Sequence, residues 1–261
     1  MVQAVPVFAA QPLRIRRIGL DEPWQWLARG WRDFRRNPFV GVVYGLLAAA
    51  TGYLLTLGLV LADLLYLLLP LSSGFFLVGP VLVVGLYEVS RRLEQGLGTG
   101  LFDALWAFRR NPVQIALMGV ALLLFHFLWV RIAALLFFLY WGIEPPSVEN
   151  LLAETFLSPR GWPFLLIGGA VGAVLAFVAY SISVIALPLL LDREDVSVVE
   201  AIAASVRAVQ VNLAPMLLWA AIIVIFTGFG LVLAYLGLIV TLPVIAHASW
   251  HAYRDLVVQE G

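Results

Sequence analysis

The sequence contains no cysteine and no lysine, and only three histidines. Without cysteine the chain has no disulfide, no thiolate metal ligand and no cysteine nucleophile. Charged residues are scarce: they make up 12% of the chain, whereas a soluble domain carries about 25%. The formal net charge is zero, so the chain has no overall basic field for binding nucleic acid. Lipid is therefore the expected solvent for much of the chain.

Apolar residues are abundant, at 62% of the 261 positions, and the mean hydropathy is +0.98. About 20 apolar residues suffice for a helix to cross a bilayer. We expect an all-α membrane protein of six transmembrane helices. The expected spans are residues 38–61, 66–89, 113–141, 163–191, 213–229 and 231–253.

The span boundaries rest on a few residues. Asp63 marks the turn between the first two spans. Residues 208–253 carry no Asp, Glu, Lys or Arg and are too long for one crossing, so we divide them at Gly228-Phe229-Gly230, where two glycines permit a turn. The first 37 residues are polar and predict no cleaved signal peptide. We expect a tail at 1–20, one membrane domain at 21–257 and a second tail at 258–261.

All sixteen basic residues are arginines, and their distribution predicts the orientation. If the N-terminus is cytoplasmic, fourteen arginines fall in cytoplasmic segments and only Arg160 falls outside. Arg131 lies within a span, while Asp63, Glu144, Glu149 and Glu154 fall outside. Basic residues concentrate on the cytoplasmic side of membrane proteins, so we expect both termini in the cytoplasm.

Three segments predict an internal repeat of an interfacial helix followed by two spans. They are LARGWRDFRRNP (27–38), LFDALWAFRRNP (101–112) and IAASVRAVQVNL (202–213), and aligning their asparagines aligns three apolar positions on one helix face. Asp21 with Pro23, and Ser197 with Glu200 as a capping box, predict two of the helix starts. The first helix has a stripe of Trp24, Leu27, Trp31 and Phe34 backed by Arg29, Arg32 and Arg36, which indicates a helix in the membrane surface.

Three further segments resemble a known family. They are Gly79–Glu94 (GPVLVVGLYEVSRRLE), Pro188–Asp192 (PLLLD) and Ser249–Val257 (SWHAYRDLV). Together they resemble the uncharacterised bacterial integral membrane proteins catalogued as domain of unknown function 2189, over about Gly30 to Val257. The resemblance implies a bacterial inner-membrane location and no established activity.

Few polar residues fall within the spans. His247 and His251 are four apart on one helix face, but the sequence supplies no third metal ligand beside them, so we expect no metal or cofactor. His126 sits in mid-span and predicts an interhelical hydrogen bond. Arg131 lies near the outer interface, where it can snorkel or form a pair. Two small-residue pairs, Gly41/Gly45 and Gly168/Gly172, predict close helix packing.

A cluster of polar residues is expected at the cytoplasmic ends of the second, fourth and sixth spans, each of which contains a proline. A set of separately solvated helix ends is the alternative. The cluster consists of Glu88, Arg91, Asp192, Arg193, His247, His251 and Arg254.

The sequence shows no P-loop, GxSxG, HExxH or paired-carboxylate motif, so we expect no enzymatic activity and assign no catalytic or cofactor-binding residue. We expect a non-enzymatic membrane protein that binds lipid or another membrane protein in a scaffolding or assembly role. A small transporter or channel is the alternative, and it would require a polar cavity at mid-depth in the membrane.

Overall fold

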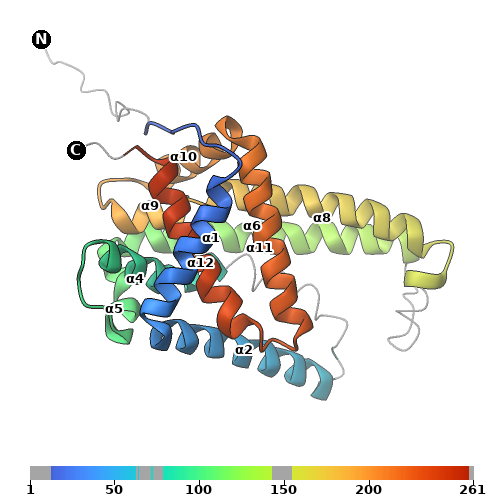
Figure 1. The fold of residues 1–261 in the computed structure, drawn as a ribbon. Coiled ribbons are helices and arrows are strands. Elements are labelled where there is room, and N and C mark those ends of the chain that lie inside the picture. The colour runs from blue at the N-terminus through green and yellow to red at the C-terminus, as the bar shows by residue number, and fades with distance from the viewer. Residues whose placement is uncertain (1–12, 63, 65–71, 73–78, 143–154, 259–261) are drawn as a thin grey trace, which may run out of the picture.

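The computed structural model describes residues 13–62, 64, 72, 79–142 and 155–258. The named elements of this part of the chain are helices (Figure 1). In chain order they are α1 (Glu22–Arg36), α2 (Pro38–Leu61), α4 (Val84–Glu94), α5 (Leu101–Leu105), the 3-10 helix η2 (Ala107–Arg110), α6 (Pro112–Trp141), α8 (Gly161–Ser183), α9 (Ala186–Asp192), α10 (Val198–Val211), α11 (Leu213–Val232) and α12 (Leu238–Leu256).

Four stretches of the described chain are long and apolar enough to cross a membrane. They are α2, α6, α8 continued by α9, and α11. They correspond to the first, third, fourth and fifth expected spans. The all-helical membrane class is therefore confirmed, with four candidate spans. In the expected second span, residues 66–71 and 73–78 lie outside the described residues.

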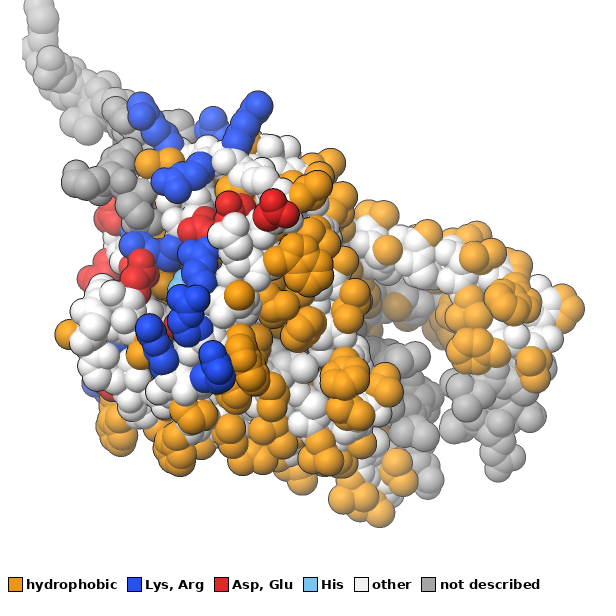
Figure 2. Space-filling model, viewed as in Figure 1, with side chains coloured by type: hydrophobic (Ala, Val, Ile, Leu, Met, Phe, Trp, Pro, Cys, Tyr) orange, Lys and Arg blue, Asp and Glu red, His pale blue; other side chains and the backbone are white. Residues whose placement is uncertain are grey.

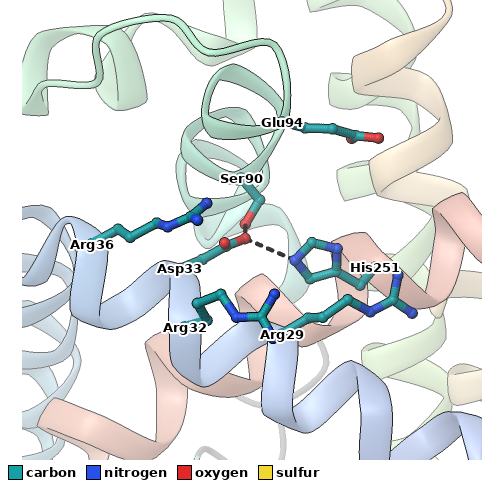
Figure 3. Close-up of a pocket in the computed structure, with 7 residues that line it drawn as sticks. All are labelled: Arg29, Arg32, Asp33, Arg36, Ser90, Glu94 and His251. Carbon is teal, nitrogen blue, oxygen red and sulfur yellow. Dashed lines mark hydrogen bonds and ion pairs between the residues drawn. The ribbon is translucent and has the colours of Figure 1, made fainter.

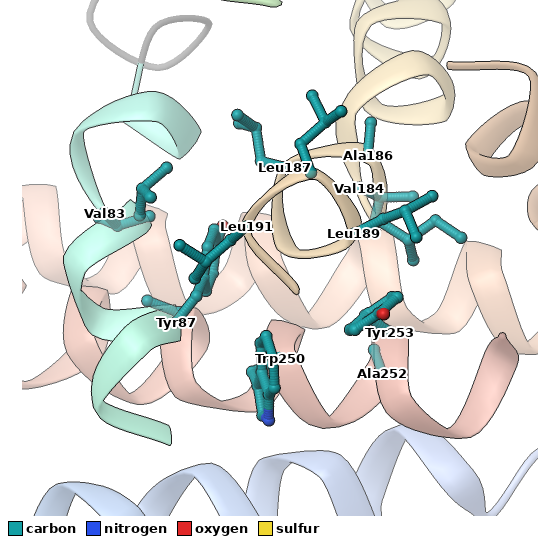
Figure 4. Close-up of a cluster of buried hydrophobic side chains, with 14 of the residues drawn as sticks. Val83, Tyr87, Val184, Ala186, Leu187, Leu189, Leu191, Trp250, Ala252 and Tyr253 are labelled. Atoms are coloured by element: carbon teal, nitrogen blue, oxygen red, sulfur yellow. The ribbon is translucent and has the colours of Figure 1, made fainter. Parts of the chain in front are cut away.

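The core forms where α4, α9 and α12 meet (Figure 4). Tyr87 from α4, Leu189 and Leu191 from α9, and Trp250 and Tyr253 from α12 are all buried there. In contrast, α6 and α8 lie side by side and extend away from this core with most of their apolar side chains exposed (Figure 1). The chain thus packs tightly at one end and presents an apolar surface suited to lipid at the other.

Helix α12 occupies the position of the expected sixth span, but it lies inside the protein. Residues along most of its length are buried, and α1, α2, α4 and α11 pack around it. Gly45 of α2 allows the closest approach, because a Cβ at this position would lie 2.4 Å from Cα of Ile239. The expected close packing at Gly41/Gly45 is therefore confirmed. At Gly168, by contrast, an added Cβ would meet no atom of the described residues within 4 Å, and at Gly172 it would reach Trp129 Cζ2 at 4.0 Å, so the described contacts do not show the close packing expected at Gly168/Gly172.

The expected turn at Gly228-Phe229-Gly230 was also wrong. Helix α11 continues through these residues to Val232, and the turn follows at residues 233–237, where Ala234 and Tyr235 have positive φ angles. Gly230 serves close packing instead, since an added Cβ would lie 2.6 Å from Leu238 Cδ2 and 2.8 Å from Thr241 Oγ1. A glycine needed for helix contact looks the same in sequence as a glycine needed for a turn.

Proline bends the expected fourth span without ending it. Pro188 has no N–H to donate to the carbonyl of Val184, and the helix breaks at Val184 and Ile185 between α8 and α9.

The end of the expected second span lies in α4, which begins after a turn at Val83 and is buried from Val84 to Arg91. This part of the expected span therefore lies in the protein core rather than in lipid.

Three asparagines occupy the expected junctions, with similar backbone angles. Asn37, Asn111 and Asn212 have φ/ψ values of −139/70°, −146/66° and −125/43°. Each side-chain amide donates to another part of the chain. Asn37 bonds the carbonyl and hydroxyl of Thr99 at 3.1 and 2.6 Å, Asn111 bonds the carbonyl of Leu190 at 3.2 Å, and Asn212 bonds the carbonyl of Arg16 at 3.0 Å.

The two helix starts also match the sequence. Helix α1 begins directly after Asp21, although the Asp21 side chain makes no capping bond. At α10 the expected capping box is present: the Ser197 N–H donates to Glu200 at 2.8 Å, and the Glu200 N–H donates to the Ser197 hydroxyl at 3.3 Å. The middle interfacial segment differs, because it is divided into α5 and η2.

Candidate functional site

Helix α1 packs one face against α12. Trp26, Gly30 and Asp33 lie four and three residues apart and are buried in this contact. The Trp26 indole N–H donates to Asp255 of α12 at 2.8 Å. A Cβ at Gly30 would lie 2.6 Å from the backbone nitrogen of Ala248. The buried face therefore places the backbone of α1 at Gly30 directly against the backbone of α12.

The stripe expected on α1 is divided between two environments. Phe34 is buried and Leu27 is partly buried against the core, whereas Trp24 and Trp31 are exposed. Phe34 and Leu27 of the expected stripe thus pack against the protein, together with Trp26 and Gly30, while Trp24 and Trp31 stay on the outer surface of the helix. Exposed tryptophans beside arginines are typical of a helix at the membrane interface.

The arginines of α1 border a small open pocket between α1, α4 and α12 (Figure 3). Its volume is about 110 Å³. Figure 2 shows basic side chains gathered over α1, next to a surface of hydrophobic side chains. The pocket is lined by Arg29, Arg32, Asp33, Arg36, Ser90, Glu94 and His251.

Asp33 links three helices at the bottom of this pocket. Its Oδ2 lies 2.8 Å from Nε2 of His251 and accepts the Ser90 hydroxyl at 2.8 Å. Ser90 Oγ is also 2.8 Å from Nδ1 of the fully buried His247. Burial alone would raise the pKa of Asp33, but the hydrogen bonds and charge of the histidines and the Ser90 hydroxyl lower it below its ordinary value. Asp33 is therefore held as a carboxylate.

Glu94 connects the pocket to the end of α9. It accepts from the Trp250 indole at 3.1 Å and forms an ion pair with Arg254 at 3.1 Å. Arg254 also reaches Asp192 at 3.4 Å, and Asp192 accepts the Tyr253 hydroxyl at 2.6 Å. Two of the expected cluster residues, Asp192 and Arg254, thus form one network with a residue that the sequence had not singled out.

Glu88 and Arg91 form a separate pair. Both are buried on α4, and the Arg91 guanidinium donates twice to the Glu88 carboxylate, each time at 2.7 Å. The hydrogen bonds and charge of Glu88 raise the pKa of Arg91, with a smaller contribution from Asp192. Arg193 donates to the carbonyl of Val258 at 3.2 Å. The expected cluster residues lie on helices that pack together, but Glu88 and His251 have different partners.

The two polar residues expected within the membrane lie apart from the pocket, on α6. Arg131 is exposed on the surface of α6. His126 is buried, but its Nδ1 has no hydrogen-bond partner among the described residues. The described contacts thus do not supply the interhelical bond expected for this nitrogen. Among the described residues, no three His, Cys, Asp or Glu side chains are grouped to hold a metal ion.

The pocket contains more basic groups than its acids can neutralise. Glu94 is paired with Arg254, and Asp33 is paired with His251. Arg29 is bonded to both carboxylate oxygens of Asp255. In the described part of the chain, Arg32 and Arg36 have no ion-pair partner.

Sequence reasoning missed Asp33, Ser90 and Glu94 as parts of a site. Asp33 lies 218 residues from His251 in the chain, and no local pattern joins them. One signal was present: Asp33 continues the spacing of Trp26 and Gly30, which places a carboxylate on the protein-facing side of an amphipathic helix. An acid in that position needs a partner from another helix.

Comparison with known proteins gives one family match. A family described as "predicted integral membrane protein", domain of unknown function 2189, matches residues 68–192. The matched segment covers α4 to α9 and is shorter than the resemblance expected from sequence, so the ending Ser249–Val257 lies outside it. No curated protein and no solved structure matches the chain. Of the pocket residues, Ser90 and Glu94 lie within the matched residues 68–192. Those from α1 and α12 lie outside the match.

Proposed function

We propose that this protein is a non-enzymatic membrane component that binds lipid or a partner protein at the arginine-rich face of α1, in a scaffolding or assembly role. The pocket on this face is the observation that carries the proposal, because two of its arginines lack an ion-pair partner among the described residues. A basic surface next to exposed tryptophans suits contact with the membrane surface or an acidic partner.

A bacterial inner membrane with both termini in the cytoplasm is the proposed location. The fourteen arginines in the expected cytoplasmic segments support this orientation. The ends of the described chain support it too, because Ile15 and Val257 form a backbone bridge and so lie on one side of the molecule (Figure 1).

Six spans in three repeated units are also part of the proposal. In each unit a short helix ends at Asn37, Asn111 or Asn212, and two spans follow. The similar backbone angles of these asparagines support the equivalence. So does the packing, because α1 contacts α12, α5 contacts α4, and α10 contacts α9. Each interfacial helix thus packs on the last helix of the unit before it, and α1 of the first unit packs on α12 of the third.

A photocrosslinking amino acid at Gln25 tests the binding role. Gln25 is exposed one turn before Arg29, so it reaches the arginine face without replacing a pocket residue. In native membranes we expect abundant crosslinks to lipid headgroups or to one defined protein. The matched control is exposed Ala203 on α10. Equal, non-specific crosslinking from the two positions would contradict the proposal.

The transporter alternative makes a different prediction. A transporter would move a solute or dissipate an ion gradient after reconstitution into sealed vesicles, because it needs a polar path through the membrane. On our proposal, vesicles containing the protein hold a pH or potassium gradient as long as protein-free vesicles. Faster loss of either gradient would favour the alternative.

A further inference from the structure

We propose that the pocket between α1, α4 and α12 binds a phosphate group through Arg32 and Arg36. The phosphate belongs to an anionic phospholipid headgroup or to free phosphate in solution. This inference rests on the proposed binding role of the arginine face and names its ligand.

The charges of the pocket select an anion. Both pocket acids are engaged: Asp33 Oδ2 contacts His251 and Ser90, and Glu94 accepts from Trp250 and Arg254. Both carboxylates therefore already have hydrogen-bond or ion-pair partners other than Arg32 and Arg36. The uncompensated charge in the described pocket is therefore the charge of two guanidinium groups, which balances a doubly charged phosphate monoester and exceeds the single charge of a phosphodiester.

The geometry suits a phosphate. Arg32 and Arg36 are four residues apart, so their guanidinium groups lie on the same face of α1, and Figure 3 shows both side chains extending from α1 on the pocket side. Each planar guanidinium can donate two parallel hydrogen bonds to phosphate oxygens. Arg29 lines the same wall, and its buried Nε has no hydrogen-bond partner among the described residues.

The neighbouring face of α1 favours a lipid as the source of the phosphate. Trp24 and Trp31 are exposed there, and Phe39 is exposed at the start of α2. Tryptophan rings concentrate at the depth of the lipid headgroups. With these rings in the interface, the pocket opens at the depth of the phospholipid phosphates.

Binding to detergent-purified full-length protein tests the inference. Three probes are compared by native mass spectrometry and thermal shift: a phosphatidylglycerol, the phosphatidylcholine of the same chain length, and inorganic phosphate. The variant Arg32→Gln/Arg36→Gln should weaken phosphatidylglycerol binding roughly 25-fold, at about fivefold per arginine near an anionic surface. The control Arg35→Gln/Arg207→Gln removes the same charge from exposed positions that do not line the pocket, and it should stay within about twofold of the unsubstituted protein because exposed charges contribute little to a specific contact.

The probes separate the sources of phosphate. Selective loss of phosphatidylglycerol binding, with phosphatidylcholine unaffected, assigns the site to a lipid headgroup. Selective loss of inorganic phosphate binding assigns it to free phosphate. Equal weakening by the two double variants, or no weakening by either, would overturn the inference. If Gln25 still crosslinks to a defined protein in that case, the proposed function stands and only its phosphate ligand is wrong.

Discussion

Asp33 is the buried acid of the pocket. Its carboxylate joins α1 to Ser90 of α4 and His251 of α12 while remaining 5% exposed. Asp33 therefore stabilises the packing of the three helices, because its loss leaves the side chains of Ser90 and His251 without this hydrogen-bond partner. Arg32 and Arg36, in contrast, are exposed and contribute little to folding.

Replacing Asp33 therefore destabilises the fold. We expect Asp33→Asn to lower the free energy of unfolding by about 2 kcal/mol, since charge-assisted hydrogen bonds are lost. Thermal unfolding in detergent measures the effect. Asp21→Asn is the matched control, because Asp21 is exposed on the same helix and makes no side-chain capping bond. Equal unfolding temperatures for the two variants would contradict this role.

The same carboxylate predicts a pH dependence. Its pKa in the folded protein lies below the ordinary value of 3.8, so its stabilising contribution is complete above that value and is lost as the pH falls through the folded pKa. We expect the difference in unfolding temperature between the unsubstituted protein and Asp33→Asn to shrink as the pH falls below about 4. A difference that grows with acidification would contradict the assignment.

At the scale of elements, the helix contacts depend on small residues at defined points. Gly45 of α2 sits against the backbone of α12, whereas at Gly58 of the same helix no atom of the described residues lies within 4 Å of the position of an added Cβ. Substituting each glycine with alanine therefore distinguishes the cost of a steric clash, expected at Gly45, from the gain in helix propensity, expected at Gly58.

The pair Gly45→Ala and Gly58→Ala tests the α2–α12 contact. We expect Gly45→Ala to destabilise the protein by about 1–3 kcal/mol, because the added methyl group meets the Ile239 backbone. Gly58→Ala should be neutral or more stable by up to about 1 kcal/mol, because alanine favours helix. Fluorescence-detected thermal unfolding measures both. If alanine at position 45 is tolerated as well as at position 58, the close contact is wrong.

The asparagine junctions give a test of the repeat. If the three units are equivalent, Asn37→Ala, Asn111→Ala and Asn212→Ala should each cost about 1–2 kcal/mol of unfolding free energy, because each leaves backbone carbonyls or hydroxyls unbonded. Exposed Gln210→Ala is the control. A loss confined to one asparagine, with the other two like the control, would speak against equivalent units.

Sequence predicted the elements whose signal is local. The continuous apolar run of α6 and the Ser197 capping box were both found, because each depends on residues close in the chain. The α11–α12 turn was misplaced, because glycine at 230 serves packing, and nothing local distinguishes that use. The pocket was not predicted, because its lining residues come from α1, α4 and α12, which are far apart in the sequence. His251 was singled out, but its partner Asp33 was not.

At the scale of the whole molecule, polar contacts and buried packing concentrate at one end, and exposed apolar side chains cover the long helices. The backbone bridge between Ile15 and Val257 holds the two ends of the described chain together at the polar end (Figure 1). In the proposed orientation, the arginine-rich face, with α1 and both termini, lies on the cytoplasmic side of a membrane that the apolar helices cross.

Cysteine labelling tests this claim most directly, because the chain contains no cysteine of its own. Gln95 is exposed directly after α4, on the arginine-rich side, and Ser147 lies between α6 and α8, outside the described residues. Single variants Gln95→Cys and Ser147→Cys are treated in intact cells with a membrane-impermeant thiol reagent, before and after permeabilisation. We predict that position 147 reacts in intact cells and position 95 reacts only after permeabilisation. Labelling of position 95 from outside, or of both positions from the same side, would contradict the account.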